Sequence, residues 1–345
     1  MFNKQRSPLP GPPRVALIAT GGTIASAPGP DGRLVPRLRA ADLIGRLPEP
    51  PGVAVEGHDA ERRAGWNMDP PAMLEVARRA DELLAAGATG IVVTHGTDTI
   101  EETAALLHVA VQGRGPVVVT GALRHDGASS PDGPANLLDA VRVAADPASA
   151  GRGCLVVLHG EVHAAPWVTK AHSHALDAFA SPGRGPVGVV EQGGRVRFLQ
   201  PPAGRRPLAV ADASADVALV RVAAGASDMP LRAAVAAGVD GVVVEGSGLG
   251  HLPGAWMPAL RQVLAAGIPV VRTSRAAAGG TGVVYDGSGG DRELRAAGVI
   301  DGGGRSGLAA RIELICAIGA GLAGDQLRER FESGSGSAAE APAGR

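Results

Sequence analysis

The chain has 345 residues, of which 45% are hydrophobic and 19% charged, so it is long enough for about two domains with buried cores and too apolar for a disordered protein. Its 33 basic and 34 acidic side chains nearly cancel, so no excess charge favours binding to nucleic acid or to a membrane surface. Because the N-terminus lacks an apolar h-region and no apolar run is long enough to span a bilayer, we expect a cytoplasmic protein.

From Arg14 onward, short β-branched runs alternate with longer helical patterns, which is typical of a parallel sheet covered by helices. The first long helix is predicted to begin after an Asp69 N-cap, with proline in its first turn, and to end at Gly87. The predicted elements are, in chain order, strand 15–20, helix 70–86, strand 90–94, helix 99–113, strand 116–120, helix 134–145 and strand 154–159.

A Pro-rich polar stretch then interrupts the pattern before a second alternating series begins. That series comprises strand 217–222, helix 230–238, strand 241–246, helix 255–267, strand 269–274 and helix 308–318. We therefore expect an α/β fold with a larger N-terminal, doubly wound, mostly parallel sheet domain and a smaller C-terminal α/β domain. The expected bounds are 14–200 for the first domain, 201–216 for a linker, 217–330 for the second domain and 331–345 for a disordered tail.

Three loops that follow predicted strands are rich in Gly, Thr, Ser and Asp: 21–26, 95–99 and 121–134. Such loops converge at the carboxyl edge of an open parallel sheet, where ligands bind. Thr23 is a candidate nucleophile, because the two preceding glycines allow a sharp turn and a close approach of substrate. A helix N-cap or a turn-forming threonine is the alternative interpretation.

The second of these loops contains Thr97 and Asp98. Asp98 with Glu101 resembles a capping box for the following helix, and the same aspartate would also face the site near Thr23. Lys170 lies in a later stretch of Gly, His, Ala and Val, where a desolvated lysine could act as a base. A solvated surface lysine is the usual alternative.

Four histidines near Lys170 suggest a metal, but their spacing does not support one. His159, His163, His172 and His174 cluster near Lys170, yet HGEVH is not a helical HExxH motif, and Gly160 disfavours a helix. Cys154 and Cys316 lie far apart in apolar runs, which predicts buried free thiols.

The motifs TGGTIAS, THGTDTIEETA, VVVTGALR, SPDGPANLLDAV and VTK, in that order, resemble the bacterial-type L-asparaginase family. The likeness extends from about Val15 to about Gly319, with GASDMP and VVRTSR in the second half. The resemblance implies an amidohydrolase that needs no metal or organic cofactor. It also implies a homotetramer, built as a dimer of intimate dimers, with active sites at domain and subunit boundaries.

Carried over to this sequence, the resemblance makes Thr23 the nucleophile that attacks a side-chain amide and forms an acyl-enzyme. Thr97 and Lys170 would handle proton transfer and water, while Asp98 would also hold the substrate's α-amino group. The backbone of Ala122 would contact the leaving amide nitrogen. The chemistry is coherent, because a weak alcohol nucleophile needs a base and the oxyanion needs donors.

The chain departs from the family pattern in the lid and in the substrate loop. The family's lid tyrosine would fall near Arg33 or Leu34, and the chain's one tyrosine, Tyr285, is elsewhere. Gly65 and Trp66 stand where the family's substrate-carboxylate loop carries a serine and a polar residue.

A third departure concerns the neighbouring subunit. Gly225 replaces the asparagine that many members contribute from that subunit, while its acidic companion corresponds to Asp286. Fewer anchors should weaken asparagine binding or redirect the site, unless Arg33 or Arg37 on the lid side pairs with the carboxylate.

We therefore predict hydrolysis of L-asparagine to L-aspartate and ammonia, with Gly65, Trp66 and Asp286 among the substrate-binding residues. Alternatives are the same chemistry on glutamine, D-asparagine or a derivatised asparagine, or a non-catalytic amino-acid-binding paralogue. A nucleotide-binding protein is disfavoured, because neither TGGTIAS nor GSGLG has the G-x-G-x-x-G spacing and no Walker lysine follows. The expected partners are a small-molecule amide and further copies of the chain.

Overall fold

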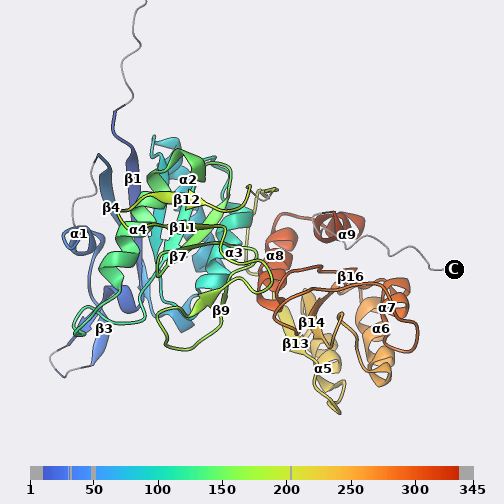
Figure 1. The fold of residues 1–345 in the computed structure, drawn as a ribbon. Coiled ribbons are helices and arrows are strands. Elements are labelled where there is room, and N and C mark those ends of the chain that lie inside the picture. Colours follow the sequence, from blue (N-terminus) through green and yellow to red (C-terminus); the bar gives the residue numbers. More distant parts are fainter. Residues whose placement is uncertain (1–10, 30, 32, 48–51, 203, 334–345) are drawn as a thin grey trace, which may run out of the picture.

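The computed structural model describes residues 11–29, 31, 33–47, 52–202 and 204–333. Two α/β domains lie side by side, one holding the N-terminal part of the chain and one the C-terminal part (Figure 1). Each has its own mostly or wholly parallel sheet, which confirms the predicted fold class.

The described part of the first domain contains a sheet of eight strands in the order β12-β11-β8-β7-β6-β5-β1-β4. Strands β4, β1, β5, β6 and β7 are parallel, and β8, β11 and β12 continue the sheet antiparallel. The bounds are β1 Arg14–Gly21, β4 Ala54–Arg63, β5 Gly90–Thr94, β6 Val117–Thr120, β7 Cys154–Leu158, β8 Glu161–Ala164, β11 Gly188–Val190 and β12 Val196–Phe198.

Helices cover both faces of this sheet because successive residues of its central strands point to opposite sides. Ala16 and Ile18 of β1 join the core under α2 (Pro70–Ala85) and α3 (Ile100–Ala110). Val15 and Leu17 join the core under α1 (Ala40–Ile44) and α4 (Gly133–Ala145). Two small hairpins extend the domain: β2 (Ser26–Pro28) with β3 (Leu34–Pro36), and β9 (Thr169–Lys170) with β10 (Phe179–Ala180).

The second domain has a parallel sheet in the order β13-β14-β15-β16, with helices on both faces. The strands are β13 Val217–Arg221, β14 Gly241–Gly246, β15 Val270–Ser274 and β16 Ile300–Asp301. One face is covered by α5 (Met229–Ala237), α6 (Met257–Ala265) and α7 (Asp291–Ala297). The other is covered by α8 (Gly307–Gly319) and α9 (Asp325–Glu332).

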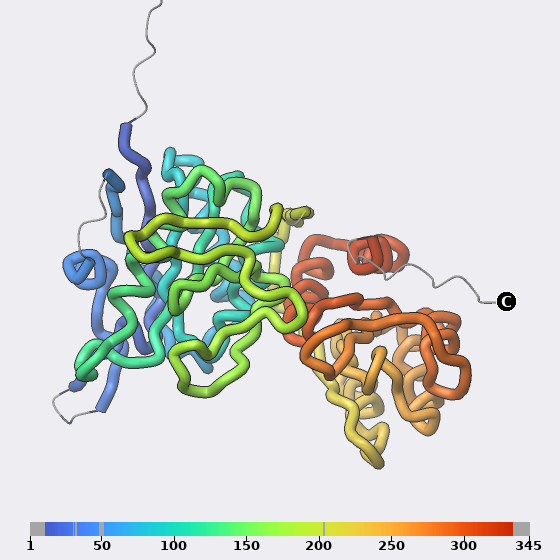
Figure 2. The backbone as a smooth tube through the Cα atoms, in the orientation of Figure 1, coloured from blue at the N-terminus to red at the C-terminus, as the bar shows by residue number. Residues whose placement is uncertain are grey.

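The two domains share a hydrophobic core, because α3 packs against α8 where the domains meet (Figure 1). The chain passes from the first domain into the second through one extended segment (Figure 2). That segment is held at both ends: Arg205 donates to His108 O of α3 at 2.8 Å, and the Ala211 amide donates to Gly319 O of α8 at 3.1 Å. These contacts and the shared core fix the position of one domain relative to the other.

Every strand and helix predicted from periodicity is present, with ends shifted by a few residues. Asp69 caps α2 as predicted, since its carboxylate accepts from the Ala72 amide at 2.9 Å. Strand β4 was not predicted, because it is an edge strand with several charged residues and no apolar run. Helix α9 was also missed, and it carries the predicted tail's first residue, Phe331, into the core; residues 334–345 lie outside the described part of the chain.

Both cysteines are free and buried, as predicted. In the part of the chain that the structure describes, helices are too short or too polar to cross a bilayer.

Candidate active site

Glycines from four loops meet backbone to backbone at the carboxyl edge of the first sheet. An ideal Cβ on Gly22 would lie 2.4 Å from Gly96 Cα, and one on Gly96 would lie 2.6 Å from Gly65 Cα. On Gly121 it would lie 2.7 Å from the carbonyl oxygen of His95. Such contacts exclude any side chain, so glycine at these positions lets four loops converge. The residues that follow these glycines directly are Thr23, Trp66, Thr97 and Ala122, all predicted for the site.

Lys170 reaches the loop after β5 from a hairpin more than seventy residues away in the sequence. Its Nζ donates to Thr97 Oγ1 at 2.9 Å and to Asp98 Oδ1 at 2.8 Å. Thr97 is buried and the Lys170 side chain is 13% exposed, whereas the Asp98 side chain is 49% exposed. Partial desolvation strengthens the contact with Thr97, and Asp98 keeps one side open to a ligand.

Thr23 begins a short 3₁₀ turn, Thr23–Ala25, after the positive-φ glycine Gly22. No side chain caps this turn, and the Thr23 hydroxyl is not that of an N-cap residue, since Gly22 holds that position. The hydroxyl of Ser26 closes the turn by donating to Gly22 O at 2.8 Å. Thr23 itself is partly exposed.

The predicted capping box of Asp98 and Glu101 is wrong. The N-cap residue of α3 is Thr99, and its hydroxyl donates to Gly65 O at 2.7 Å instead of accepting from the helix. This bond ties the loop after β4 to the start of α3, while Asp98 is engaged by Lys170. Asp98 is therefore free of a capping role.

His95 holds the loop of residues 95–99 in place through two hydrogen bonds. Its Nδ1 donates to Gly96 O at 2.8 Å, so its Nε2 accepts from the Thr103 hydroxyl at 2.9 Å. Complete burial lowers its pKa to about 4, and the backbone bond opposes the shift only in part. A neutral imidazole thus fixes Gly96 and, with it, the backbone before Thr97.

The loop after β6 is held by the start of α4. Asn136 Nδ2 donates to Gly121 O at 3.0 Å, and Asp132 accepts from the Leu123 amide at 3.0 Å. Ala122, which lies between these anchored residues, is buried. An ideal Cβ on the preceding residue, Gly121, would lie 3.2 Å from Thr97 Cγ2, so the loops after β5 and β6 lie against each other.

Three residues predicted for the outer part of the site, Trp66, Arg33 and Arg37, are exposed. Trp66 is 74% exposed and belongs to a turn, Gly65–Asn67, that contacts residues 96–99. The β2–β3 hairpin carries the two arginines of the lid side: Arg33 is paired loosely with Asp31 at 3.7 Å, and Arg37 donates to Pro28 O at 3.4 Å.

Asp286 is not brought to the Thr97 and Lys170 cluster within one chain. It lies in the second domain, 78% exposed, and pairs with Arg292 at 3.4 Å. Gly225, on the loop after β13, has φ 73° and is exposed. The role predicted for Asp286, and the loss of the family's asparagine at Gly225, concern a neighbouring subunit's site and stay predictions.

Among the described residues, no group of three or more His, Cys, Asp or Glu side chains is placed so that it could hold a metal ion. His163 is buried against Ser181 and Glu161, at 3.0 and 3.1 Å. His159 forms the tight turn between β7 and β8, with φ 51°.

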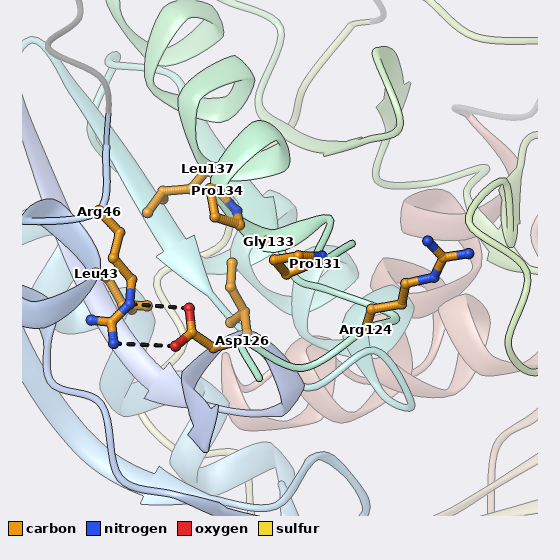
Figure 3. A pocket seen from close by; sticks show the side chains of 9 residues that line it. Leu43, Arg46, Arg124, Asp126, Pro131, Gly133, Pro134 and Leu137 are labelled. Carbon is orange, nitrogen blue, oxygen red and sulfur yellow. Dashed lines mark hydrogen bonds and ion pairs between the residues drawn. The ribbon is translucent and has the colours of Figure 1, made fainter. Parts of the chain in front are cut away.

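A pocket lined in part by Ile24, the residue after Thr23, has none of the predicted catalytic residues in its lining (Figure 3). Ile24, Leu43 and Leu137 form its apolar wall. Arg46 and Asp126 line the rim and pair through two bonds of 3.1 and 3.2 Å, which join the end of α1 to the loop after β6 (Figure 3). Since neither Thr97, Asp98 nor Lys170 lines it, we treat the pocket as separate from the site.

One signal in the sequence could have identified Lys170 without structural knowledge. The chain has two lysines, Lys4 and Lys170, and uses arginine for its other 31 basic residues. Arginine stays protonated in proteins, whereas lysine is a compact charge that can lose its proton. A lysine in so arginine-rich a chain therefore marks a place where the two are not interchangeable.

Two family models together match most of the chain: Asparaginase, N-terminal, over residues 14–204, and the Glutaminase/Asparaginase C-terminal domain over residues 216–331. A probable L-asparaginase of Deinococcus radiodurans is 38% identical over 93% of this chain and 98% of its own length. L-asparaginase 2 of Escherichia coli is 35% identical over 78% and 80%, respectively.

Similar proteins are not limited to asparaginases. One component of the glutamyl-tRNA(Gln) amidotransferase of Methanosarcina mazei is 33% identical over 87% of this chain and 72% of its own length. Among solved structures, a probable cytoplasmic L-asparaginase from Campylobacter jejuni has a TM-score of 0.80 and 29% identity, covering 92% of this chain and 99% of that one.

Proposed function

The chain belongs to the asparaginase family of amidohydrolases, and on that premise we propose that it hydrolyses L-asparagine to L-aspartate and ammonia through an ester on Thr23. The observation that carries the proposal is the contact of Lys170 Nζ with both Thr97 Oγ1 and Asp98 Oδ1. This contact brings the Lys170 ammonium to an alcohol and a carboxylate on the loop after β5. Gly96 of that loop touches Gly22, the residue before Thr23.

In the first step, Thr23 Oγ1 attacks the side-chain amide carbon and the carbonyl becomes an oxyanion. Backbone N–H groups at the strand ends are the proposed donors to this oxyanion. The C–N bond then breaks, the nitrogen takes up the proton that the Thr23 hydroxyl has lost and leaves as ammonia, and Thr23 carries the acyl group. The backbone of Ala122 is the proposed contact for the leaving nitrogen.

In the second step, water attacks the ester and releases aspartate and the Thr23 hydroxyl. Thr97 is the proposed relay for the proton of that water, because its hydroxyl is buried beside Lys170. The ammonium stabilises negative charge that develops on Thr97 Oγ1. The open side of Asp98 is the proposed contact for the substrate's α-amino group.

The turn at residues 65–66 offers no hydroxyl, amide or cationic side chain that could bind the substrate's carboxylate. Gly65 offers no hydroxyl, and a side chain there would meet Gly96, since its Cβ would lie 3.1 Å from Gly96 Cα. Trp66 supplies an exposed indole instead of a polar group. Glutamine, D-asparagine and derivatised asparagines therefore remain alternative substrates of the same site, and a non-catalytic binding protein is the alternative from another class.

The test is ammonia release from L-asparagine by the wild type, Thr23→Ala and Thr97→Val, with a panel of the alternative amides. We expect turnover by the wild type that both substitutions abolish. Turnover that survives Thr23→Ala would refute the threonyl ester. If no amide is consumed but one raises the melting temperature, the chain is a binding protein.

We also propose the first domain and the linker with the bounds given above, a second domain extended through α9 to Glu332, a cytoplasmic location, and a homotetramer in which Asp286 and the Gly225 loop approach a neighbouring subunit's site. Light scattering of the purified protein tests the assembly. A monomer with full activity would remove Asp286 from the substrate-binding residues.

A further inference from the structure

We propose that Arg46 and Asp126 are positioning residues that hold the turn of Thr23 at a fixed distance from the loop of Ala122. The inference rests on the function proposed above, in which Thr23 attacks an amide carbon and the backbone of Ala122 contacts the nitrogen of the same amide. Because both groups act on one amide, their spacing has to be held to within about 0.5 Å. The ion pair takes no part in the chemistry and acts through the elements that carry these groups.

The turn of Thr23 is joined to α1 through the backbone. Ala25, the last residue of that turn, accepts hydrogen bonds at its carbonyl oxygen from the amides of Arg37 and Leu38, both at 3.0 Å. Helix α1 begins two residues after Leu38. A displacement of α1 is therefore transmitted to the turn of Thr23.

Helix α1 depends on contacts outside itself, because its five residues make little more than one turn. Its start is held by β4, since the Ala40 amide donates to Asp59 Oδ1 at 2.9 Å. Its end is held by Arg46, whose Nη1 donates to Asp42 O of α1 at 2.9 Å. The Nε and Nη2 atoms of the same guanidinium donate to the two carboxylate oxygens of Asp126 at 3.1 and 3.2 Å (Figure 3). Such a two-bond contact fixes direction as well as distance.

Asp126 lies on the loop after β6, four residues beyond Ala122. The inner part of this loop is bonded to α4, because Asp132 accepts from the amides of Leu123 and Arg124 at 3.0 and 2.8 Å. Asp126 lies beyond these two amides. Its pair with α1 therefore anchors the outer part of the loop.

Two packing contacts run along the same boundary as the ion pair. An ideal Cβ on Gly127 would lie 3.3 Å from Cγ and Cδ of Pro28, in β2. Closer to the site, an ideal Cβ on Gly133 would lie 3.0 Å from Ile24 Cγ1 and 3.5 Å from Ala122 Cβ. The segment that follows the nucleophile thus packs against the loop after β6 and the start of α4, and the ion pair closes this boundary at its outer end.

Arg14 and Glu56 provide a control pair in the same domain. They also join two elements, β1 and β4, but at the amino ends of these strands, opposite the site. Their single contact is 3.4 Å long and their side chains are 58% and 61% exposed, against 37% and 28% for Arg46 and Asp126. Loss of a surface ion pair as such is therefore separated from loss of the contact beside the site.

The experiment compares the wild type with Arg46→Ala, Asp126→Ala, the double variant and Arg14→Ala. The first readout is kcat and KM for L-asparagine, together with the melting temperature. The second readout is hydrogen exchange, measured by mass spectrometry on peptides that cover residues 23–29 and 37–47. Hydrogen exchange does not depend on turnover.

For Arg46→Ala and Asp126→Ala we expect kcat to fall roughly five- to tenfold with KM within about twofold, because the attacking group and the contact for the leaving nitrogen lose their fixed spacing. Both peptides should exchange several times faster, while the melting temperature falls by a few degrees at most. The double variant should resemble the single ones, since each already breaks the pair. Arg14→Ala should match the wild type in kcat and in exchange.

A wild-type kcat in either single variant, unchanged exchange in residues 23–29, or an equal effect of Arg14→Ala would overturn the inference. So would losses that add up in the double variant. If the wild type consumes no amide, the proposed function fails by itself. The inference is then decided by exchange alone: faster exchange of residues 23–29 in both single variants supports it, and unchanged exchange overturns it.

Discussion

Replacing Lys170 with cysteine and then rebuilding the amine chemically tests the proposed site more directly than deletion. Lys170→Cys removes both contacts of the ammonium, to Thr97 at 2.9 Å and to Asp98 at 2.8 Å. Alkylation of the new thiol with bromoethylamine then restores an ammonium at nearly the original distance. The native thiols should not react, because burial raises the pKa of both, that of Cys316 to about 12.

The expected loss follows from the exposure of the two partners. Thr97 is buried, so its bond to a charged donor is worth about 1.5–3 kcal/mol. Asp98 is half exposed, so its ion pair adds about 1 kcal/mol or less. If the Thr97 bond acts in the transition state, kcat for asparagine should fall at least roughly 10- to 100-fold.

The assay is steady-state ammonia release before and after alkylation, with the melting temperature of each form and the alkylated wild type as control. We expect the aminoethylated variant to recover most of the lost kcat. A Lys170→Cys variant with wild-type kcat would refute the reasoning. So would an intact, fully alkylated variant that recovers nothing.

Three further predictions concern stability and substrate binding. Gly96→Ala should lower the melting temperature by a few degrees and abolish activity, because the new Cβ would lie 2.6 Å from Gly65 Cα. Gly204→Ala is the control and should change neither, because a Cβ there has no atom within 4 Å. Equal effects of the two substitutions would contradict this prediction. His108 has a pKa lowered to about 4 by burial and by Arg205, so folding stability should fall as pH drops from 6.5 toward 4, by up to about 3 kcal/mol. His108→Gln should flatten that decline in calorimetry, and an unchanged slope would exclude His108 as its source. Trp66→Ser should leave stability within about 0.5 kcal/mol but change KM for asparagine; an unchanged KM would remove Trp66 from the proposed substrate-binding residues.

The sequence predicts the central strands and the helices that cover them, because fully buried strands are continuous apolar runs and their helices have apolar stripes. It misses β4, where ten residues at the sheet edge include charged side chains such as Glu61 and Arg62. It also misses α9, whose attachment depends on Phe331 reaching a core formed by other elements. Local periodicity does not contain such tertiary contacts.

In the site, local motifs identify the loops but not their contacts. Nothing in the spacing of Thr97 and Lys170 predicts a 2.9 Å bond across seventy residues. The capping box failed for the same reason: a distant lysine competes for Asp98, and Thr99 bonds to the loop after β4. The glycines at 22, 65, 96 and 121 are visible as turn residues, but their mutual contact appears only when four strands lie in one sheet.

The shared core of α3 and α8 has a consequence for synthesis of the chain. Helix α3 ends at Ala110, and α8, the helix that covers it, begins at Gly307, so the ribosome reaches α8 197 residues after the end of α3. At ordinary translation rates of about 5–20 residues per second, the apolar side of α3 remains uncovered by α8 for roughly 10–40 s. During that interval the nascent first domain exposes an apolar surface of the kind that chaperones bind. In the folded protein α8 covers this surface.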